Sequence, residues 1–249
     1  MPRVAVISDI HGNLEALQAV LKAIAADGVD IIVHLGDLVG YNADPKECAQ
    51  LLKANGAVSV LGNHDLAILE PKMVKGFNVL AHAAITYTQQ QLTAAETRYL
   101  QGMPRVEVLW DKYLLCHGSP ESIESYLLNL FQAKRIFNLL RKRYAGIRFC
   151  FFGHTHVQKL WICDERGKVF SPAELPNQFP LQDDHSYLIN PGSVGQPRQH
   201  DSRARYLIFD TDRNLIDFKA VSYDIETAQK KILEANLPKY LAHRLQDGI

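Results

Sequence analysis

The chain has 249 residues, of which 47% are hydrophobic and 22% are charged, a composition typical of a globular protein with a sizeable core. Lys plus Arg and Asp plus Glu both number 27, so the formal net charge is zero and no global basic field attracts nucleic acid. The zero charge favours recognition of a small molecule or a local anion, and no apolar run approaches the roughly 20 residues needed to span a membrane.

The first sixty residues alternate between predicted strands and helices. Strands are predicted at residues 3–8, 30–35 and 57–61, and helices at residues 14–26 and 45–54. Asn13 and Asp44 are the expected N-caps of the two helices, and Pro45 suits the first position of the second helix. This order predicts parallel strands joined by right-handed crossovers.

The remaining sequence predicts a helical segment at about residues 66–104 and then further strands. Asn78 to Gln91 is expected to form one helix, and Thr93 with Glu96 forms a capping box for the next. Later strands are predicted at 106–110, 113–116, 147–152, 159–163, 168–170, 187–189, 206–209 and 215–221, helices at 131–143 and 225–235 and at the terminus, and a surface loop at 171–186. Without a repeat or a linker, a single domain over residues 1–249 is the most economical prediction, and the helical segment is expected to be either a lid or a packed layer.

Side chains of metal-ligand types follow five of the predicted buried strands. These clusters are Asp9 with His11, Asp37, Asn63 with His64, His117, and His154 with His156. In open α/β sheets, ligands bind at the carboxyl ends of the strands, so the five clusters are expected to meet at one place. Because residues i and i+2 of an extended chain point to the same side, Asp9 can converge with His11, and His154 can converge with His156.

The donor types in these clusters are carboxylate, imidazole and amide oxygen, without thiolate. This mixture suits Mn²⁺, Fe, Ni²⁺ or Zn²⁺ and disfavours a structural zinc finger. Seven ligands are too many for one catalytic ion with an open position, and they suit two ions that share a carboxylate.

The clusters resemble the motifs of the calcineurin-like metallophosphoesterase superfamily, in particular its small prokaryotic phosphodiesterases. The motifs are Asp9-x-His11, Gly36-Asp37, Gly62-Asn63-His64-Asp65, His117-Gly118 and Gly153-His154-Thr155-His156, in the family's order. The resemblance implies an α/β fold, a four-layer α/β/β/α sandwich of two mixed sheets flanked by helices. It also implies an enzyme, a metal-dependent phosphoesterase in which a metal-bound hydroxide attacks phosphorus.

The resemblance also implies a role for each motif residue. The implied ligands are Asp9, His11 and His156 for one divalent ion, Asn63, His117 and His154 for the second, and Asp37 as the bridge. The expected metal is manganese, with iron, nickel or zinc as alternatives. His64 would contact the substrate, either stabilising the transition state or protonating the leaving oxygen. Asp65 would orient the His64 imidazole or stiffen its loop, with a plain turn carboxylate as the alternative.

Two further stretches bear on the substrate. Residues 190–198 resemble a segment of the small phosphodiesterases, and Arg198 could bind phosphate through two nitrogens, although a tight turn with a surface arginine fits equally well. The second motif continues from Asp37 as Leu-Val-Gly-Tyr-Asn, without the Asp-Arg pair usual in protein serine/threonine phosphatases and symmetrical dinucleotide tetraphosphatases. We therefore expect a phosphodiester or nucleotide-type substrate. Tyr41 could stack on a base, but an aromatic loop anchor is the favoured interpretation.

Several other functions compete with this prediction. A phosphomonoesterase and a dinucleoside polyphosphate hydrolase are alternatives within the family. A non-catalytic scaffold on the same fold is disfavoured because every ligand position and His64 are present, and a DNA nuclease is disfavoured by the zero net charge. The four cysteines contain no C-x-x-C pair, and the chain enters its first strand without a signal-peptide segment, so we expect a cytoplasmic protein with a small-molecule phosphoester as its partner.

Overall fold

The first three strands of the computed structural model, which describes residues 2–249, are parallel neighbours as predicted. They are β1 (Arg3–Ile7), β2 (Ile31–His34) and β3 (Val58–Ser59), connected by α1 (Leu14–Ala26) and α2 (Pro45–Ala54). The Asn13 side chain caps α1 by accepting the Ala16 backbone N–H at 3.1 Å. Asp44 occupies the N-cap position of α2 as predicted, but its side chain makes no capping hydrogen bond, and its carboxylate pairs with the Lys231 ammonium group at 2.9 Å.

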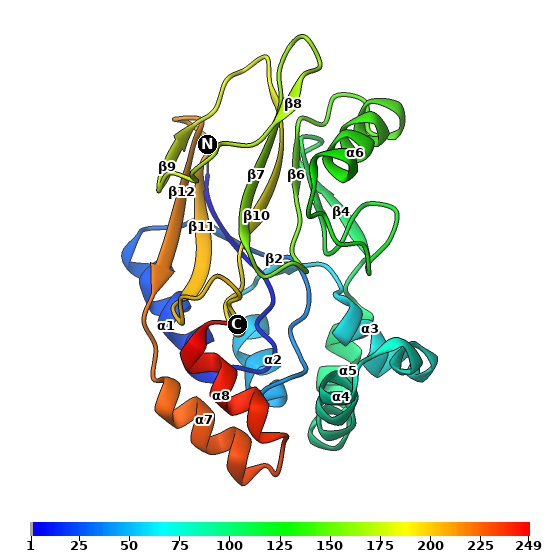
Figure 1. The fold of residues 1–249 in the computed structure, drawn as a ribbon, viewed down its shortest axis with the longest axis vertical. Helices are drawn as coiled ribbons and strands as arrows, with labels where there is room; N and C mark the ends of the chain where they lie inside the picture. The colour runs from blue at the N-terminus through cyan, green and yellow to red at the C-terminus, as the bar shows by residue number, and fades with distance from the viewer. Residues whose placement is uncertain (1) are drawn as a thin grey trace.

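Two six-stranded mixed sheets lie side by side at the centre of the fold (Figure 1). The first has the order β3-β2-β1-β11-β12-β9, and it adds β11 (Ala204–Asp210), β12 (Leu215–Val221) and β9 (Gln178–Pro180). The second contains, in spatial order, β4 (Val106–Leu109), β5 (Tyr113–Cys116), β6 (Phe149–Phe151), β10 (Ser186–Pro191), β7 (Gln158–Cys163) and β8 (Val169–Phe170). The prediction of a loop over residues 171–186 was wrong for Gln178–Pro180, which form β9. This short segment pairs with the edge of β12 through backbone hydrogen bonds, which leave no pattern in the side chains.

The side chains of β1 alternate between two hydrophobic cores. Val4 and Val6 lie in the core between the two sheets. Ala5 and Ile7 lie in the core that the first sheet forms with α1 and α2. On the other side of the molecule, α6 (Leu130–Arg143) covers the outer face of the second sheet (Figure 1). These layers form the predicted four-layer α/β/β/α sandwich.

The remaining helices gather at the lower end of the molecule in Figure 1. The segment predicted as helical contains α3 (Asn63–Leu69), the 3₁₀ helix at Pro71–Gly76, α4 (Val79–Gln91) and α5 (Ala94–Gln101). The predicted capping box of Thr93 and Glu96 begins α5. The last two helices are α7 (Ile225–Glu234) and α8 (Lys239–Asp247). No helix within residues 2–249 combines the length and the apolar character that crossing a membrane requires.

Candidate metal centre

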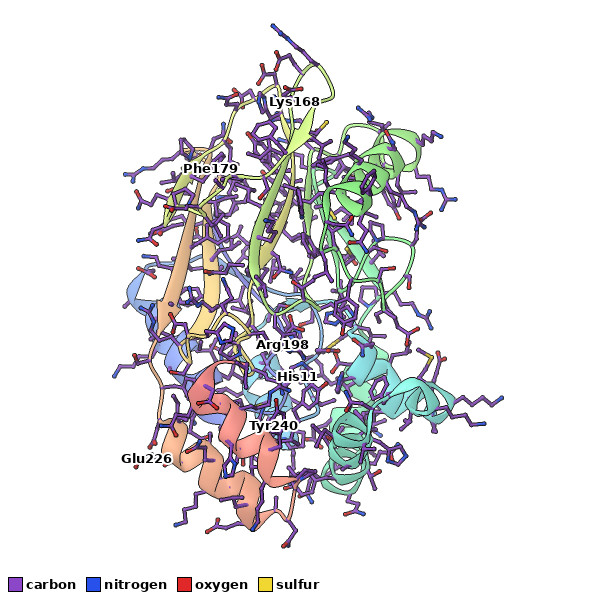
Figure 2. All side chains as sticks on the ribbon, in the orientation of Figure 1. His11, Lys168, Phe179, Arg198, Glu226 and Tyr240 are labelled. Carbon is purple, nitrogen blue, oxygen red and sulfur yellow. The ribbon has the colours of Figure 1, made fainter. Side chains whose placement is uncertain are left out.

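The loops that carry the predicted site residues meet at one edge of the two sheets. The first sheet contains the parallel strands β1, β2 and β3, and the second contains the parallel strands β5, β6 and β10. The carboxyl ends of the strands in each set therefore lie at the same end of the sheet. All seven predicted ligands and His64 are buried there. Figure 2 shows the labelled side chains of His11 and Arg198 close together below the strands.

Most of the predicted ligands have a left-handed backbone. The φ angles are 55° at Asp9, 50° at His11, 56° at Asp37, 66° at His154 and 61° at His156. Such angles are uncommon outside glycine and cost free energy, so the surrounding structure must hold them. The prediction of extended chain at Asp9–His11 and at His154–His156 is therefore wrong, because left-handed turns place these side chains.

Asp9, His11 and His156 form the first cluster, with ligand atoms within 4.8 Å of one another. Asp9 Oδ1 lies 3.2 Å from His156 Nε2, and the Nε2 atoms of the two histidines lie 3.2 Å apart. The Nδ1 atom of His11 is 3.0 Å from the Val39 carbonyl oxygen, and that of His156 is 2.6 Å from the Gln196 carbonyl oxygen. Each Nδ1 therefore donates a hydrogen, and each Nε2 carries a lone pair that faces into the cluster.

Asp37, His117 and His154 form the second cluster. Asp37 Oδ2 lies 3.3 Å from His117 Nε2 and 3.5 Å from His11 Nε2, so this oxygen faces both clusters, as a bridging ligand requires. The side-chain oxygen of Asn63 lies 3.1 Å from His117 Nε2. The structure thus brings together every residue that the sequence predicts as a ligand.

The donor atoms of the two clusters fit divalent cations. The Nδ1 atoms of His11, His117 and His156 all donate to backbone carbonyl oxygens, the arrangement that fixes a metal-ligating imidazole. The buried Asp9 Oδ1 and His154 Nε2 have no hydrogen-bond partner in residues 2–249. A cation among these atoms would satisfy them and remove the repulsion between their lone pairs.

Burial and charge shift the protonation of the clusters in the absence of a cation. Burial raises the pKa of Asp9 to about 7. Burial lowers the pKa of His117, but the Asp37 carboxylate more than offsets it, so the value rises to about 9. Protons thus occupy the site at neutral pH when no metal does, and metal binding must displace them.

His64 lies between the clusters and an aromatic wall. Its backbone N–H donates to Asp37 Oδ1 at 2.8 Å, and its ring centroid is 4.8 Å from that of His11, 4.6 Å from Tyr41 and 4.8 Å from Phe77. Its Nδ1 atom is buried without a hydrogen-bond partner in the described chain, and burial lowers its pKa to about 4. The imidazole is therefore neutral near pH 7 in the ligand-free site.

The Asp65 carboxylate holds the loop that carries Asn63 and His64. One oxygen accepts the Gly62 backbone N–H at 2.9 Å, and the other accepts the Val39 backbone N–H at 3.1 Å. Of the roles that we expected for Asp65, this geometry favours stiffening the loop. Gly62 is required by space, since a Cβ atom there would lie 2.0 Å from a side-chain oxygen of Asp37.

Residues 190–198 brace two of the ligand loops. The Ser193 hydroxyl and the Gly195 backbone N–H both donate to the Asp9 carbonyl oxygen, at 2.8 Å and 2.9 Å. The Asn190 amide donates to the Gly153 carbonyl oxygen at 2.8 Å. The sequence predicted a phosphate contact in this segment. Its hydrogen bonds to the loops of Asp9 and Gly153 follow only from the tertiary structure.

A cavity of about 280 Å³ lies next to the clusters. Its lining includes Asp37, Asn63, His64, His154 and His156 from the predicted site, together with Tyr41, Phe77, Glu124, Tyr126 and Arg198. Arg198 donates from Nη2 to the Gln196 side-chain oxygen at 2.9 Å, and its buried Nε has no partner among residues 2–249. Tyr41 is only 7% exposed, which favours the loop anchor over the base platform.

Comparison with known proteins decides the family. Residues 3–214 match the calcineurin-like phosphoesterase superfamily domain. The chain belongs to this superfamily. The uncharacterized protein MJ0912 of Methanocaldococcus jannaschii is 36% identical over 247 residues, which cover 97% of this chain and 96% of that protein. The crystal structure of a metallophosphoesterase from Sphaerobacter thermophilus has a TM-score of 0.83 and 36% identity, and the match covers 100% of this chain and 99% of that chain.

A shorter match is to an enzyme with a named substrate. A symmetrical bis(5'-nucleosyl)-tetraphosphatase of Actinobacillus pleuropneumoniae is 39% identical over 67 residues, which cover 26% of this chain and 25% of that enzyme. Membership of the calcineurin-like superfamily confirms the family predicted from the five motifs, and the structural match confirms the fold. The family is one of phosphoester hydrolases.

Proposed function

We propose that the protein is a phosphodiesterase that uses two divalent metal ions, manganese in the first place, to hydrolyse a small-molecule or nucleotide-type phosphodiester. The position of Asp37 carries this proposal. Its Oδ2 atom lies 3.5 Å from His11 Nε2 in one cluster and 3.3 Å from His117 Nε2 in the other, as a shared ligand of two ions would. Family membership supports the same chemistry.

The implied ions and the chain's own residues would divide the reaction between them. Two divalent ions held by the clusters would polarise the phosphoryl oxygens and supply a nucleophilic water near neutral pH. His64, neutral and lining the cavity, offers an imidazole N–H to the charge that develops on a phosphoryl or leaving oxygen. Arg198 would hold the phosphate through its guanidinium group, and Asp65 would act as a positioning residue for the His64 loop.

The charges around the cavity support a diester over a monoester. A phosphodiester carries one negative charge near neutral pH, whereas a monoester carries close to two. Beyond the charge of the two proposed ions, Arg198 supplies one positive charge to the cavity lining, and Glu124 supplies a carboxylate that would repel the second negative charge of a monoester. The missing Asp-Arg pair after Asp37 likewise argues against a protein phosphatase.

A dinucleoside polyphosphate hydrolase is the second candidate function. The match of 67 residues to a symmetrical bis(5'-nucleosyl)-tetraphosphatase favours it. The absent Asp-Arg pair opposes it, since that pair is usual in those enzymes. A scaffold without activity is disfavoured because all seven ligand residues converge and are buried.

The protein's thiols support a location in the cytoplasm. All four cysteines are buried and free, and the sulfur atoms of Cys116 and Cys150 lie 3.9 Å apart without a bond. Such pairs persist as thiols in a reducing compartment. We therefore retain the cytoplasm as the proposed location.

A hydrolysis panel tests the proposed function. The purified protein with Mn²⁺ is offered bis(p-nitrophenyl) phosphate, p-nitrophenyl phosphate, cyclic nucleotides, dinucleoside polyphosphates and single-stranded DNA, with Asp37→Asn as the control for contaminating hydrolases. We expect the diesters to be hydrolysed fastest. A preference for p-nitrophenyl phosphate would indicate a phosphatase, and no hydrolysis with any divalent metal would indicate a scaffold.

A further inference from the structure

The loop between β5 and α6, residues 117–129, places an aromatic ring at the cavity. The Tyr126 ring centroid lies 4.0 Å from that of the His154 imidazole, with the ring planes tilted by 32°. Tyr126 nevertheless remains 46% exposed and lines the cavity. One side of the phenol ring is thus covered by a residue of the second cluster, and much of the ring stays open to a ligand.

The position of this ring is fixed by its neighbours in the loop. Ile123 and Leu127 on either side are buried in two different cores, one on the outer side of each sheet. Earlier in the loop, the Ser119 backbone N–H donates to the Ser122 carbonyl oxygen at 2.9 Å, and the Ser122 backbone N–H donates to the Ser119 hydroxyl at 3.1 Å. The loop is therefore anchored on both sides of Tyr126, and the Tyr126 ring stays partly exposed at the cavity.

The hydroxyl group does not account for the placement of Tyr126, because it makes no hydrogen bond to another residue of the described chain. A second aromatic residue, Phe77, also lines the cavity, where its ring centroid is 4.8 Å from that of His64. The cavity therefore has the metal clusters on one side and aromatic rings in its walls. This arrangement suits a molecule that joins a phosphate to a planar ring.

We propose that Tyr126 binds a planar aromatic group of the substrate by stacking, and that it thereby selects phosphoesters of nucleosides or aryl alcohols over purely aliphatic ones. This inference rests on the proposed function, since the phosphate must lie at the metal clusters for the ring to reach Tyr126. Stacking on an aromatic side chain tolerates any base, because every base offers a π face. Tyr126 would therefore recognise the class of substrate and not a particular base.

Binding of two matched probes to the Mn²⁺-loaded protein tests this selection. Adenosine 5'-monophosphate and ribose 5-phosphate share the sugar and the phosphate and differ in the base, so the ratio of their dissociation constants isolates the contribution of the ring. We expect wild type to bind adenosine 5'-monophosphate about tenfold more tightly or better. In Tyr126→Ala this preference should disappear while ribose 5-phosphate binds as before, and Tyr126→Phe should retain it.

Tyr240→Ala, an exposed tyrosine of α8 that does not line the cavity, is the matched control and should keep the preference. Phenyl phosphate compared with methyl phosphate extends the test from a base to a simple aryl ring, and a preference for phenyl phosphate that Tyr126→Ala abolishes would support stacking independently. Calorimetry measures all of these dissociation constants without requiring turnover.

Four outcomes would overturn the proposal. Equal binding of the two nucleotide probes by wild type, with bis(p-nitrophenyl) phosphate still hydrolysed, removes the stacking role and leaves the proposed function intact. A preference that survives in Tyr126→Ala has the same consequence. If Tyr126→Ala loses bound manganese and weakens both probes equally, Tyr126 instead positions His154. Absence of both probe binding and hydrolysis in wild type would overturn the proposed function together with this inference.

Discussion

The Nε2 atoms of His11 and His156 lie 3.2 Å apart, although the Nδ1 atom of each ring faces a backbone carbonyl oxygen. With both Nδ1 atoms donating, two lone pairs point at each other in a buried site, and Asp9 Oδ1 adds a further acceptor 3.2 Å from His156 Nε2. Neutral imidazoles gain nothing from this arrangement, whereas Asp9, His11 and His156 together would hold a cation. This relationship is the strongest structural indication of a metal ion in the protein.

The shared position of Asp37 predicts that its loss disturbs both ions. Asp37→Asn removes the charge that faces the two clusters, so we expect fewer than two ions per chain. The value of kcat/KM should fall by about 100-fold or more, because replacing a residue that only hydrogen-bonds to a metal ligand already costs about 10- to 100-fold. Metal content after desalting, measured by mass spectrometry, checks the stoichiometry. Asp183→Asn, which changes an exposed carboxylate, is the control. Two ions retained by Asp37→Asn would refute the bridging role.

His64 is predicted to contact the substrate and not to be a metal ligand. Its imidazole lines the cavity, and burial keeps it neutral near pH 7 by lowering its pKa to about 4. We expect His64→Ala to lower kcat by about 10²- to 10⁴-fold while two ions remain bound. Steady-state kinetics and metal analysis of the same preparation check both parts. Unchanged turnover, or loss of an ion, would contradict this assignment.

The Asp65 carboxylate is predicted to stabilise the fold through the loop that it holds. Asp65→Ala leaves the buried backbone N–H groups of Gly62 and Val39 without an acceptor. Each unsatisfied group costs about 1–3 kcal/mol, so the free energy of unfolding should fall by about 2 kcal/mol or more. Asp65→Asn should lose less, because an amide oxygen still accepts one of the bonds. Urea unfolding measures both variants, and a stability of Asp65→Ala equal to wild type would dismiss this role.

His34, which is not one of the predicted ligands, gives a pH-dependent prediction. Both of its ring nitrogens are buried without a partner in residues 2–249, and burial lowers its pKa to about 3. Between this value and the unfolded pKa of about 6.5, the unfolded chain binds the extra proton, so stability falls as the pH decreases through this range.

Replacing His34 removes this contribution. Between about pH 7.5 and about pH 5.5, wild type should lose about 1.4 kcal/mol more unfolding free energy than His34→Leu, because the other titrating groups are common to both. Urea unfolding at the two pH values gives the difference directly. Equal losses in the two proteins would show that His34 does not remain neutral in the folded state.

The convergence of the predicted ligand residues could be expected from the sequence because their positions depend on local chain order. Asp9 and Asp37 each follow a buried strand, and parallel neighbouring strands bring their carboxyl ends together whatever the details of packing. The bounds of α1 were likewise predictable, since Asn13 caps it within a few residues. The left-handed backbone at the ligands was not predictable, because strand periodicity alone suggested extended chain.

Features that depend on contacts between residues far apart in the chain could not be predicted from the sequence. Asp44 is the N-cap residue of α2, but its carboxylate pairs with Lys231, far along the chain, and does not cap the helix. β9 exists because of backbone pairing with β12, which leaves no periodic signal. Tyr126 lies in a loop without a motif beyond His117 and Gly118, and its place beside the second cluster depends on the burial of its neighbours in two cores.

A titration of metal-depleted protein with Mn²⁺ tests the central claim most directly. The initial rate of bis(p-nitrophenyl) phosphate hydrolysis is measured at a protein concentration well above the metal dissociation constants. We predict no hydrolysis without metal, and a rate that rises until two equivalents per chain have been added. Hydrolysis by the metal-free protein, a rate that saturates at one equivalent, or no hydrolysis at any metal concentration would contradict the two-metal phosphodiesterase.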